Sequence, residues 1–183
     1  MRHSASKGIR ELVYTALASA LIAVSAFVII PLPSAVAITL QSFGVYFAIF
    51  FLGGRRGTLA VALYITIGAV GLPVFSGFTG GVGRLLDAGG GFIFGFLLAA
   101  LAYWLMTVLF GERLRFLFAA LSHLILYTVG ALWYSLVYLG AGEAELSAVL
   151  LTCVFPFVIP DAIKLFLAAF VAKKLERIVK FRK

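Results

Sequence analysis

The chain consists mainly of long apolar runs, separated by short polar or glycine-containing segments. Apolar residues follow one another within these runs, without the alternation of polar and apolar positions that marks the strands of a transmembrane barrel. Backbone groups inside a bilayer must be hydrogen-bonded within the protein, and runs of this length suit helices. The pattern predicts a bundle of six transmembrane helices, over residues 12–30, 35–52, 58–72, 89–110, 116–139 and 146–172.

Composition indicates the class of protein to which these helices belong. Of the 183 residues, 63% are hydrophobic and 12% are charged, and the mean hydropathy is +1.14. A water-soluble globule needs more polar surface than this, since about a quarter of its residues are usually charged. We therefore expect an all-α integral membrane protein with a single six-helix domain over residues 1–183. Six spans leave no room for a soluble catalytic or nucleotide-binding domain.

Basic residues are distributed unequally between the connections of these predicted helices. The formal net charge is +8, and 13 of the 15 Lys and Arg residues lie before the first run, in alternate connections, or after the last run. Arg84 is the only basic residue in the remaining connections, and Lys164 lies inside the last run. Because Lys and Arg favour the cytoplasmic side, both termini are expected in the cytoplasm. The same bias explains the charge without a nucleic-acid partner.

The connection between the third and fourth runs is rich in glycine. Eight of the 19 glycines lie between Gly77 and Gly95, on the side that the charge distribution places outside the cell. Glycine allows backbone conformations and close approaches that other residues cannot make. We expect this loop to form either a tight cap over a site or a flexible lid.

A carboxylate and an ammonium group lie inside the last apolar run, in the stretch IPDAIK. Pro160 suits the first turn of a helix, which would put Asp161 near a helix N-terminus. Lys164 follows three residues later, so the two charged side chains share a helix face. They can form an ion pair that holds the span in the bundle. They can also form the polar wall of a ligand cavity, opened by breaks at Pro156 and Pro160.

Two further features have two interpretations each. Ala16, Ala20 and Ala23 form a stripe of small residues along the first span, which permits the close approach of another helix. That helix belongs either to the same bundle or to a separate membrane protein. Gln41 is the only glutamine, and a buried amide needs hydrogen-bond partners. It is either a ligand contact or a contact between helices.

Sequence motifs of enzymes are absent. The chain contains no HExxH or GxSxG motif and no cluster of Cys and His residues with metal-binding spacing. The lone His123, near the start of the fifth run, fits a structural role. We therefore expect a protein that is not an enzyme and that uses no cofactor or metal.

Four stretches taken in order, ITLQSF, GGRRG, GLPVFSGFTGGVGRLL and IPDAIK, resemble the BioY family of biotin-binding S-components of energy-coupling-factor (ECF) transporters. The resemblance implies a six-helix S-component in a prokaryotic cell membrane, with a ligand cavity toward the outer face beneath the glycine-rich loop. It implies biotin as ligand, a transmembrane coupling subunit docked on the alanine stripe, and two cytoplasmic ATPases. An S-component for another vitamin and an autonomous carrier or channel are the alternatives.

The resemblance also implies roles for individual residues. Asp161 would accept hydrogen bonds from the ureido N–H groups of biotin, and Lys164 or Gln41 would donate to the ureido oxygen. Either Lys164 or Arg84 would bind the carboxylate of the ligand. Further candidates, for the apolar wall of the cavity and for the loop over it, are Phe75, Phe78, Phe92, Trp133, Gly80 and Gly81.

The sequence departs from the family pattern in the stretch DAGGGF, residues 87–92. Relatives commonly carry a Gly-Pro-Thr-Gly-Gly-Tyr-like run there, whereas this chain lacks the Pro and the Thr and has Phe92 in place of the Tyr. Hydrogen bonds from that Tyr and that Thr are therefore not available. Asp87 is an additional residue close to Arg84, and it forms either a local ion pair or a new polar contact.

Overall fold

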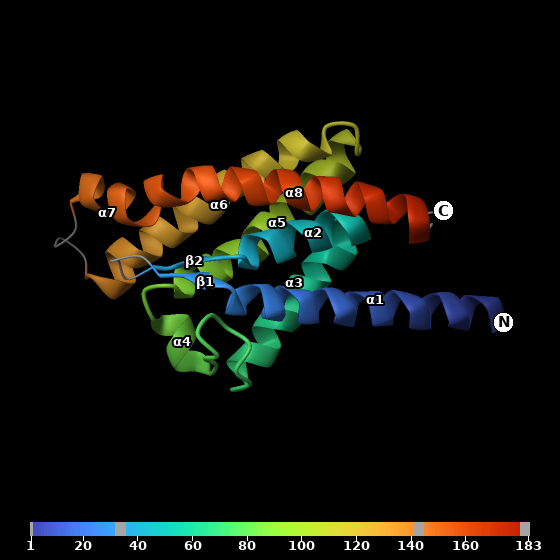
Figure 1. Cartoon of the computed structure of the whole chain (residues 1–183), viewed down its shortest axis with the longest axis horizontal. Helices are drawn as coiled ribbons and strands as arrows, with labels where there is room; N and C mark the ends of the chain where they lie inside the picture. Colours follow the sequence, from blue (N-terminus) through green and yellow to red (C-terminus); the bar gives the residue numbers. More distant parts are fainter. Residues whose placement is uncertain (1, 32–35, 141–144, 180–183) are drawn as a thin grey trace.

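The structure, a computed structural model, describes residues 2–31, 36–140 and 145–179 and is almost entirely helical. Long helices run beside one another along the long axis of the molecule (Figure 1). In chain order the elements are α1 (Arg2–Phe27), β1 (Ile29–Ile30), β2 (Ile38–Thr39), α2 (Gln41–Leu52), α3 (Gly54–Ala69), α4 (Val82–Leu86), α5 (Gly90–Phe110), α6 (Arg115–Trp133), the π-helix η1 (Tyr134–Tyr138), α7 (Leu146–Cys153) and α8 (Phe155–Val179).

α2 forms the centre of the bundle. Every residue of α2 except Phe43 is buried, and α1, α3 and α8 pack around it. Gly53, with φ of 84°, makes the sharp turn from α2 into α3. The two helices come so close after this turn that a Cβ at Gly57 would lie 2.5 Å from the Cα of Ile49. Gln41 and Ser42, the polar residues at the start of α2, are both buried in the bundle.

Four helical segments are long and apolar enough to cross a membrane: Gly8–Phe27, Gly90–Phe110, Arg115–Val137 and Ser147–Val179. Large apolar side chains on their outer faces are exposed, among them Leu109, Phe166 and Phe170. An outer surface of this kind fits lipid surroundings. Each of the six predicted runs contains a helix, but α2 and α3 have only 12 and 16 residues. The count of six crossings therefore stays a prediction.

The helix in the second predicted span begins later than expected. β1 pairs antiparallel with β2, with Ile29 opposite Thr39, and the N–H of Leu40 donates to the carbonyl of Val28 at 3.0 Å. Side chains branched at Cβ, which dominate these strands, favour extended backbone. Residue 35, where a helix was expected to start, lies outside the described residues. For residues 36–40 the prediction is wrong, because α2 begins only at Gln41.

The break in the last span lies before both prolines. Val154, between α7 and α8, has φ of −124° and ψ of −62°. α8 then begins at Phe155, so Pro156 lies in its first turn and Pro160 lies inside the helix. The expectations that Pro160 starts a helix and that Asp161 occupies the first turn are wrong, because the helix starts several residues earlier. Asp161 lies instead within a continuous helix.

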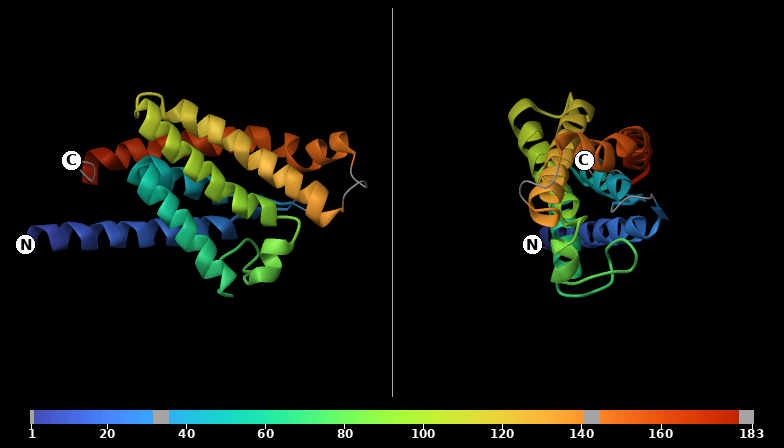
Figure 2. Two further views of the ribbon diagram at one scale, coloured as in Figure 1. Left: turned by 180° about the vertical axis from the view of Figure 1, so that it is seen from behind. Right: turned by 90° about the vertical axis from the view of Figure 1, so that its left-hand side faces the viewer.

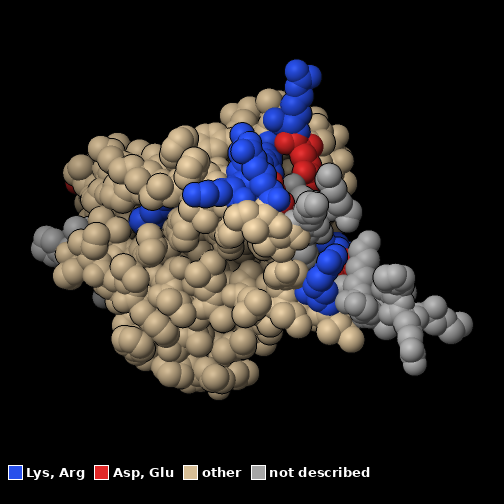
Figure 3. All heavy atoms as spheres, turned by 45° about the vertical axis from the view of Figure 1, so that its right-hand side comes forward, with Lys and Arg blue, Asp and Glu red and all other residues tan. Residues whose placement is uncertain are grey.

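Both ends of the described chain lie at one end of the molecule, and α4 and α7 lie at the other (Figures 1 and 2). Lys and Arg side chains gather around the end that carries the termini (Figure 3). Ion pairs Arg56–Glu11 and Arg115–Glu176 join α3 to α1 and α6 to α8. This arrangement agrees with the charge distribution in the sequence, while the orientation in the membrane stays a prediction.

Candidate functional site

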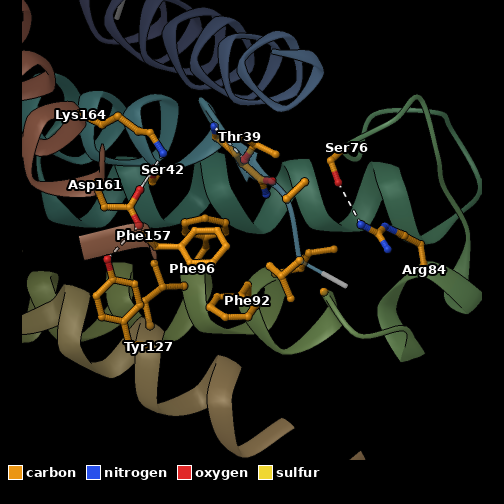
Figure 4. Close-up of a pocket in the computed structure, with 16 residues that line it drawn as sticks. Thr39, Ser42, Ser76, Arg84, Phe92, Phe96, Tyr127, Phe157, Asp161 and Lys164 are labelled. Carbon is orange, nitrogen blue, oxygen red and sulfur yellow. Dashed lines mark hydrogen bonds and ion pairs between the residues drawn. The ribbon is translucent and has the colours of Figure 1, made fainter. Parts of the chain in front are cut away.

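A cavity lies between α2, α5, α6 and α8, with β2 and α4 at its border (Figure 4). One of its ends lies beside α4, away from the chain termini (Figures 1 and 4). The cavity is lined by Val36, Ala37, Thr39, Gln41, Ser42, Ser76, Arg84, Gly89, Phe92, Ile93, Phe96, Leu126, Tyr127, Phe157, Asp161 and Lys164.

Asp161 is the centre of a polar cluster at one end of this cavity. Its Oδ1 accepts from Ser42 Oγ and from Lys164 Nζ, each at 2.8 Å. Its Oδ2 accepts from the Tyr127 hydroxyl at 3.0 Å and lies 3.3 Å from Nε2 of His123. A carboxylate has about four lone-pair sites, and these donors occupy them. The ion pair that the sequence allowed is therefore present, inside a larger network.

His123 belongs to this network rather than standing alone. Its Nδ1 lies 3.0 Å from the hydroxyl of Tyr46, and both residues are buried. Since an ionised carboxylate only accepts, Nε2 must carry the hydrogen that points at Asp161. In the neutral ring Nδ1 then accepts from the Tyr46 hydroxyl, and this arrangement satisfies both partners. Tyr46 thus contacts His123, and His123 in turn contacts Asp161.

The middle of the cavity is apolar. α5 contributes Phe92, Ile93 and Phe96, and α8 contributes Phe157. The rings of Phe92 and Phe157 stack with their centroids 6.3 Å apart. In Figure 4 the three phenylalanines lie between the Asp161 cluster and Arg84. The cavity therefore has two polar ends that are separated by aromatic walls.

Arg84 forms the second polar end. Its Nη1 makes the local ion pair with Asp87 that the sequence allowed, and its Nη2 donates to Ser76 Oγ at 3.0 Å. The Nε atom is buried and has no hydrogen-bond partner among the described residues. Trp133 donates from Nε1 to the carbonyl of Asp87 at 3.1 Å, which ties this loop to α6. The guanidinium is thus oriented by its neighbours, with one N–H left for another group.

Several residues predicted to surround the ligand do not line the cavity. Phe75 is fully buried and packs edge-on against Tyr64, with ring centroids 5.4 Å apart. Phe78 is 67% exposed and stacks on Phe27. Trp133 packs beside Phe94 as well as holding Asp87. Their roles as ligand contacts stay predictions, whereas Gln41 and Phe92 do line the cavity.

Gly80 and Gly81 hold the loop against the end of α3. A Cβ at Gly80 would lie 2.2 Å from the carbonyl oxygen of Leu72, so the position tolerates no side chain. The N–H of Gly81, with φ of 88°, donates to the carbonyl of Gly68 at 2.7 Å. Neither glycine lines the cavity. The loop is therefore built by specific contacts, and its action as a lid stays a prediction.

The three alanines of the stripe on α1 differ in burial, which bears on whether the stripe packs inside the bundle or against a separate membrane protein. Ala23 is buried in the bundle, whereas Ala16 and Ala20 are exposed. Leu12 and Leu17, on the outward side of the same helix, are exposed as well. Internal packing therefore accounts for Ala23 only, and a partner for Ala16 and Ala20 stays a prediction.

Sequence reasoning missed Ser42, Tyr46 and Tyr127 as members of the cluster. Ser42 directly follows Gln41 in the ITLQSF stretch, and Tyr127 follows His123 by one helical turn, so the signals were present in the sequence. Tyr46 likewise follows Ser42 by one helical turn, but its contact with His123 depends on tertiary packing and could not be read from the spacing. Among the described residues, no group of three or more His, Cys, Asp or Glu side chains could hold a metal ion.

Known proteins resemble this chain both in sequence and in fold. The sequence profile described as the BioY family matches residues 1–181. A biotin transporter BioY of Thermotoga maritima is 36% identical over 170 residues, which cover 92% of this chain and 97% of the relative. One from Rhodobacter capsulatus is 37% identical over 180 residues, covering 91% and 93%. A crystal structure of the S-component for biotin from an ECF-type ABC transporter matches with a TM-score of 0.82 and 25% identity, covering 94% of this chain and 93% of that one.

Proposed function

The chain belongs to the BioY family, and we propose that it is the membrane subunit that binds biotin for uptake. It is a multi-pass membrane transport protein rather than an enzyme. The names of the relatives and the matching S-component structure support biotin as the ligand. The observation that carries the proposal is a cavity with two polar ends and aromatic walls between them.

The chemical groups of biotin match the polar and apolar regions of this cavity, and they follow one another in the same order. Its ureido ring has two N–H donors and an oxygen acceptor, its thiophane ring is apolar, and its tail ends in a carboxylate. We assign the ureido ring to the end with Asp161 and Lys164, and the thiophane to the phenylalanine walls. Because side chains of the protein already donate to the lone-pair sites of Asp161, a ureido N–H must replace one of these donors. Lys164 is the donor best suited to leave, since its ammonium can turn to the ureido oxygen.

The carboxylate of the ligand is assigned to Arg84. Both cations are paired, Lys164 with Asp161 and Arg84 with Asp87, but Nε of Arg84 is buried and has no hydrogen-bond partner among the described residues. A guanidinium also matches the geometry of a carboxylate better than an ammonium does. The sequence left both cations open, and we propose Arg84 rather than Lys164 as the partner of the carboxylate.

The proposed orientation puts the cavity near the extracellular side and both termini in the cytoplasm. It is supported by the basic residues around the termini, because Lys and Arg favour the cytoplasmic side. We further propose that Ala16 and Ala20 dock on the transmembrane coupling subunit of an ECF module with two ATPases. Their exposure on α1 supports this surface.

A binding measurement tests the proposal. The protein is purified in detergent, co-purified small molecules are identified by mass spectrometry, and biotin binding is measured by titration calorimetry beside other vitamins. We expect biotin to bind, and Arg84→Gln to weaken biotin much more than its neutral methyl ester. Preferential binding of another vitamin would assign the chain to a different S-component. Biotin uptake by vesicles that contain this protein alone would favour an autonomous carrier.

A further inference from the structure

The segment that joins α3 to α5 exposes many apolar side chains and contains few charges. No Asp, Glu, Lys or Arg lies between Arg56 and Arg84. Within residues 70–86, five large apolar side chains are more than half exposed: Val70, Leu72, Phe78, Val82 and Leu86. A connection that lies in water is normally polar, and exposed apolar patches mark contacts with a membrane or with another protein. The outer surface of this segment therefore calls for a partner.

The short helix α4 is apolar on both its inner and its outer side. Leu85 is buried against the bundle, whereas Val82 and Leu86 lie one turn apart on the outward face and are exposed. Arg84, the only charged residue of α4, lines the cavity and is bonded there to Ser76 (Figure 4). The charge of this helix is thus directed inward, and its outward face indicates apolar surroundings.

Phe78 connects this surface to α1. In the described parts of the chain it is the only residue other than glycine with a positive φ, 57°, a conformation that L residues rarely adopt. The backbone is therefore strained at the point where it directs a large ring outward. That ring stacks on Phe27, the last residue of α1, with the centroids 4.2 Å apart. The apolar surface of the segment thus joins the outer surface of a helix that is long and apolar enough to cross a membrane.

The position of the segment along the bundle identifies the partner as lipid. α7 lies further from the chain termini than α4 does (Figures 1 and 2), and α7 belongs to the candidate membrane span Ser147–Val179. α4 therefore lies beside a spanning segment and not beyond its end. The backbone of the segment is also bonded internally, since the N–H of Phe75 donates to the carbonyl of Thr79 at 2.9 Å and that of Gly81 to the carbonyl of Gly68 at 2.7 Å. Such bonds lower the cost of leaving water.

We propose that residues 70–86 form an interfacial anchor, in which Phe78, Val82 and Leu86 insert into the membrane leaflet on the side away from the chain termini. Interfacial segments bury apolar side chains about 5–10 Å into the boundary between headgroups and acyl chains. The boundary fits better than the hydrocarbon core, because irregular backbone exposed to lipid does not occur in the core. α3 has 16 residues and is about 24 Å long, less than the ~30 Å of the core, so the anchor continues the contact with lipid where α3 ends. This inference does not depend on which ligand the cavity binds.

Nitroxide spin labels on the full chain in lipid nanodiscs test the anchor. Labels are attached to Phe78→Cys, Val82→Cys and Leu86→Cys, and the unchanged protein, whose only cysteine is the buried Cys153, gives the background. Collisions of each label are measured with oxygen, which concentrates in the bilayer, and with a water-soluble nickel chelate. We expect oxygen-to-nickel collision ratios that approach the ratio at the lipid-facing reference Phe170→Cys, because Phe170 is exposed on the spanning helix α8.

Glu145→Cys is the matched control in water. Glu145 is exposed and precedes α7, at the same end of the molecule as α4, so its label should collide mainly with the nickel chelate. Ratios at Val82 and Leu86 equal to the ratio at Glu145 would overturn the anchor. Few collisions with either reagent would overturn it as well, because they would mean that another protein molecule covers this face. Val82 and Leu86 decide the outcome if Phe78→Cys fails to fold for loss of its stack on Phe27.

Discussion

Lys164 Nζ lies 2.8 Å from Oδ1 of Asp161, one helical turn away on α8, and both residues are buried. Taking two charges out of water is costly, and their attraction offsets this cost only when the geometry is good and the remaining sites are satisfied. Here Ser42, Tyr127 and His123 occupy the remaining sites of the carboxylate. The pair is thus part of the bundle's packing as well as of the proposed binding site.

Removing only one charge of this pair should destabilise the bundle. In Asp161→Asn the Lys164 ammonium stays buried without a counter-ion, which typically costs about 3–5 kcal/mol. We expect a lower unfolding midpoint in detergent and a strong loss of biotin affinity. The double variant Asp161→Asn, Lys164→Met removes both charges and should recover much of the stability but not the binding. A double variant as unstable as the single one would contradict this account.

His123 should affect the ligand through Asp161, and Tyr46 should act only through His123. Tyr46 reaches the carboxylate by way of Nδ1 and Nε2 of the imidazole. We expect Tyr46→Phe to weaken biotin in the unchanged background and to have little further effect in His123→Ala. Coupling of this kind is about 0.5–3 kcal/mol between contacting residues. The measurement is a double-mutant cycle of biotin affinities, and additive effects would mean that the two residues act independently.

The two exposed alanines of α1 should be needed for uptake but not for binding. Leucine at both Ala16 and Ala20 would keep a partner helix at a distance, because close helix approach in membranes depends on small residues. We expect biotin uptake with the coupling subunits to fall while the isolated protein binds biotin normally. Ala23→Leu is the matched contrast, since Ala23 is buried and the larger side chain should lower stability. Loss of binding in the first variant would show that these positions pack internally.

The loop over the cavity should become less mobile when biotin binds. Trp133→Phe keeps an aromatic ring beside Phe94 but removes the bond from Nε1 to the carbonyl of Asp87. We expect faster hydrogen exchange over residues 75–92 and faster biotin dissociation in this variant, because a less firmly held loop opens more often, and lid opening limits release in many enzymes. Exchange in the unchanged protein should slow with biotin. Equal exchange with and without biotin would mean that the loop only caps the bundle.

The apolar runs were enough to predict the helical class, and the charged pair within the last run was enough to identify Asp161 as a candidate site residue. The Asp161–Lys164 contact followed from helix spacing alone, because both side chains lie on one helix. Tyr46 and Ser42 could not be connected to Asp161 in this way, since their contacts depend on how α2 packs against α6 and α8. Local spacing thus identified the centre of the cluster, and tertiary packing supplied its other members.

In the glycine-rich loop, the sequence did not predict correctly which side chains face the cavity. Its composition predicted a cap or lid, and its phenylalanines were assigned to the ligand. In the structure Phe75 fills the space beside Gly68, where a Cβ would lie 2.1 Å from the ring, and Phe78 turns outward at φ of 57°. Composition does not determine which side of a loop each ring faces, because the backbone turns decide it.

Ion pairing around the cavity has an electrical consequence. Lys164 is paired with Asp161 and Arg84 with Asp87, so these four side chains together carry no net charge. A biotin carboxylate adds one negative charge that nothing in this set cancels. Moving that charge inward against a negative-inside voltage costs up to about 2.3 kcal/mol per 100 mV. Transport of biotin by this protein is therefore expected to be electrogenic, and vesicles that are depolarised should take up biotin faster at the same ATP concentration.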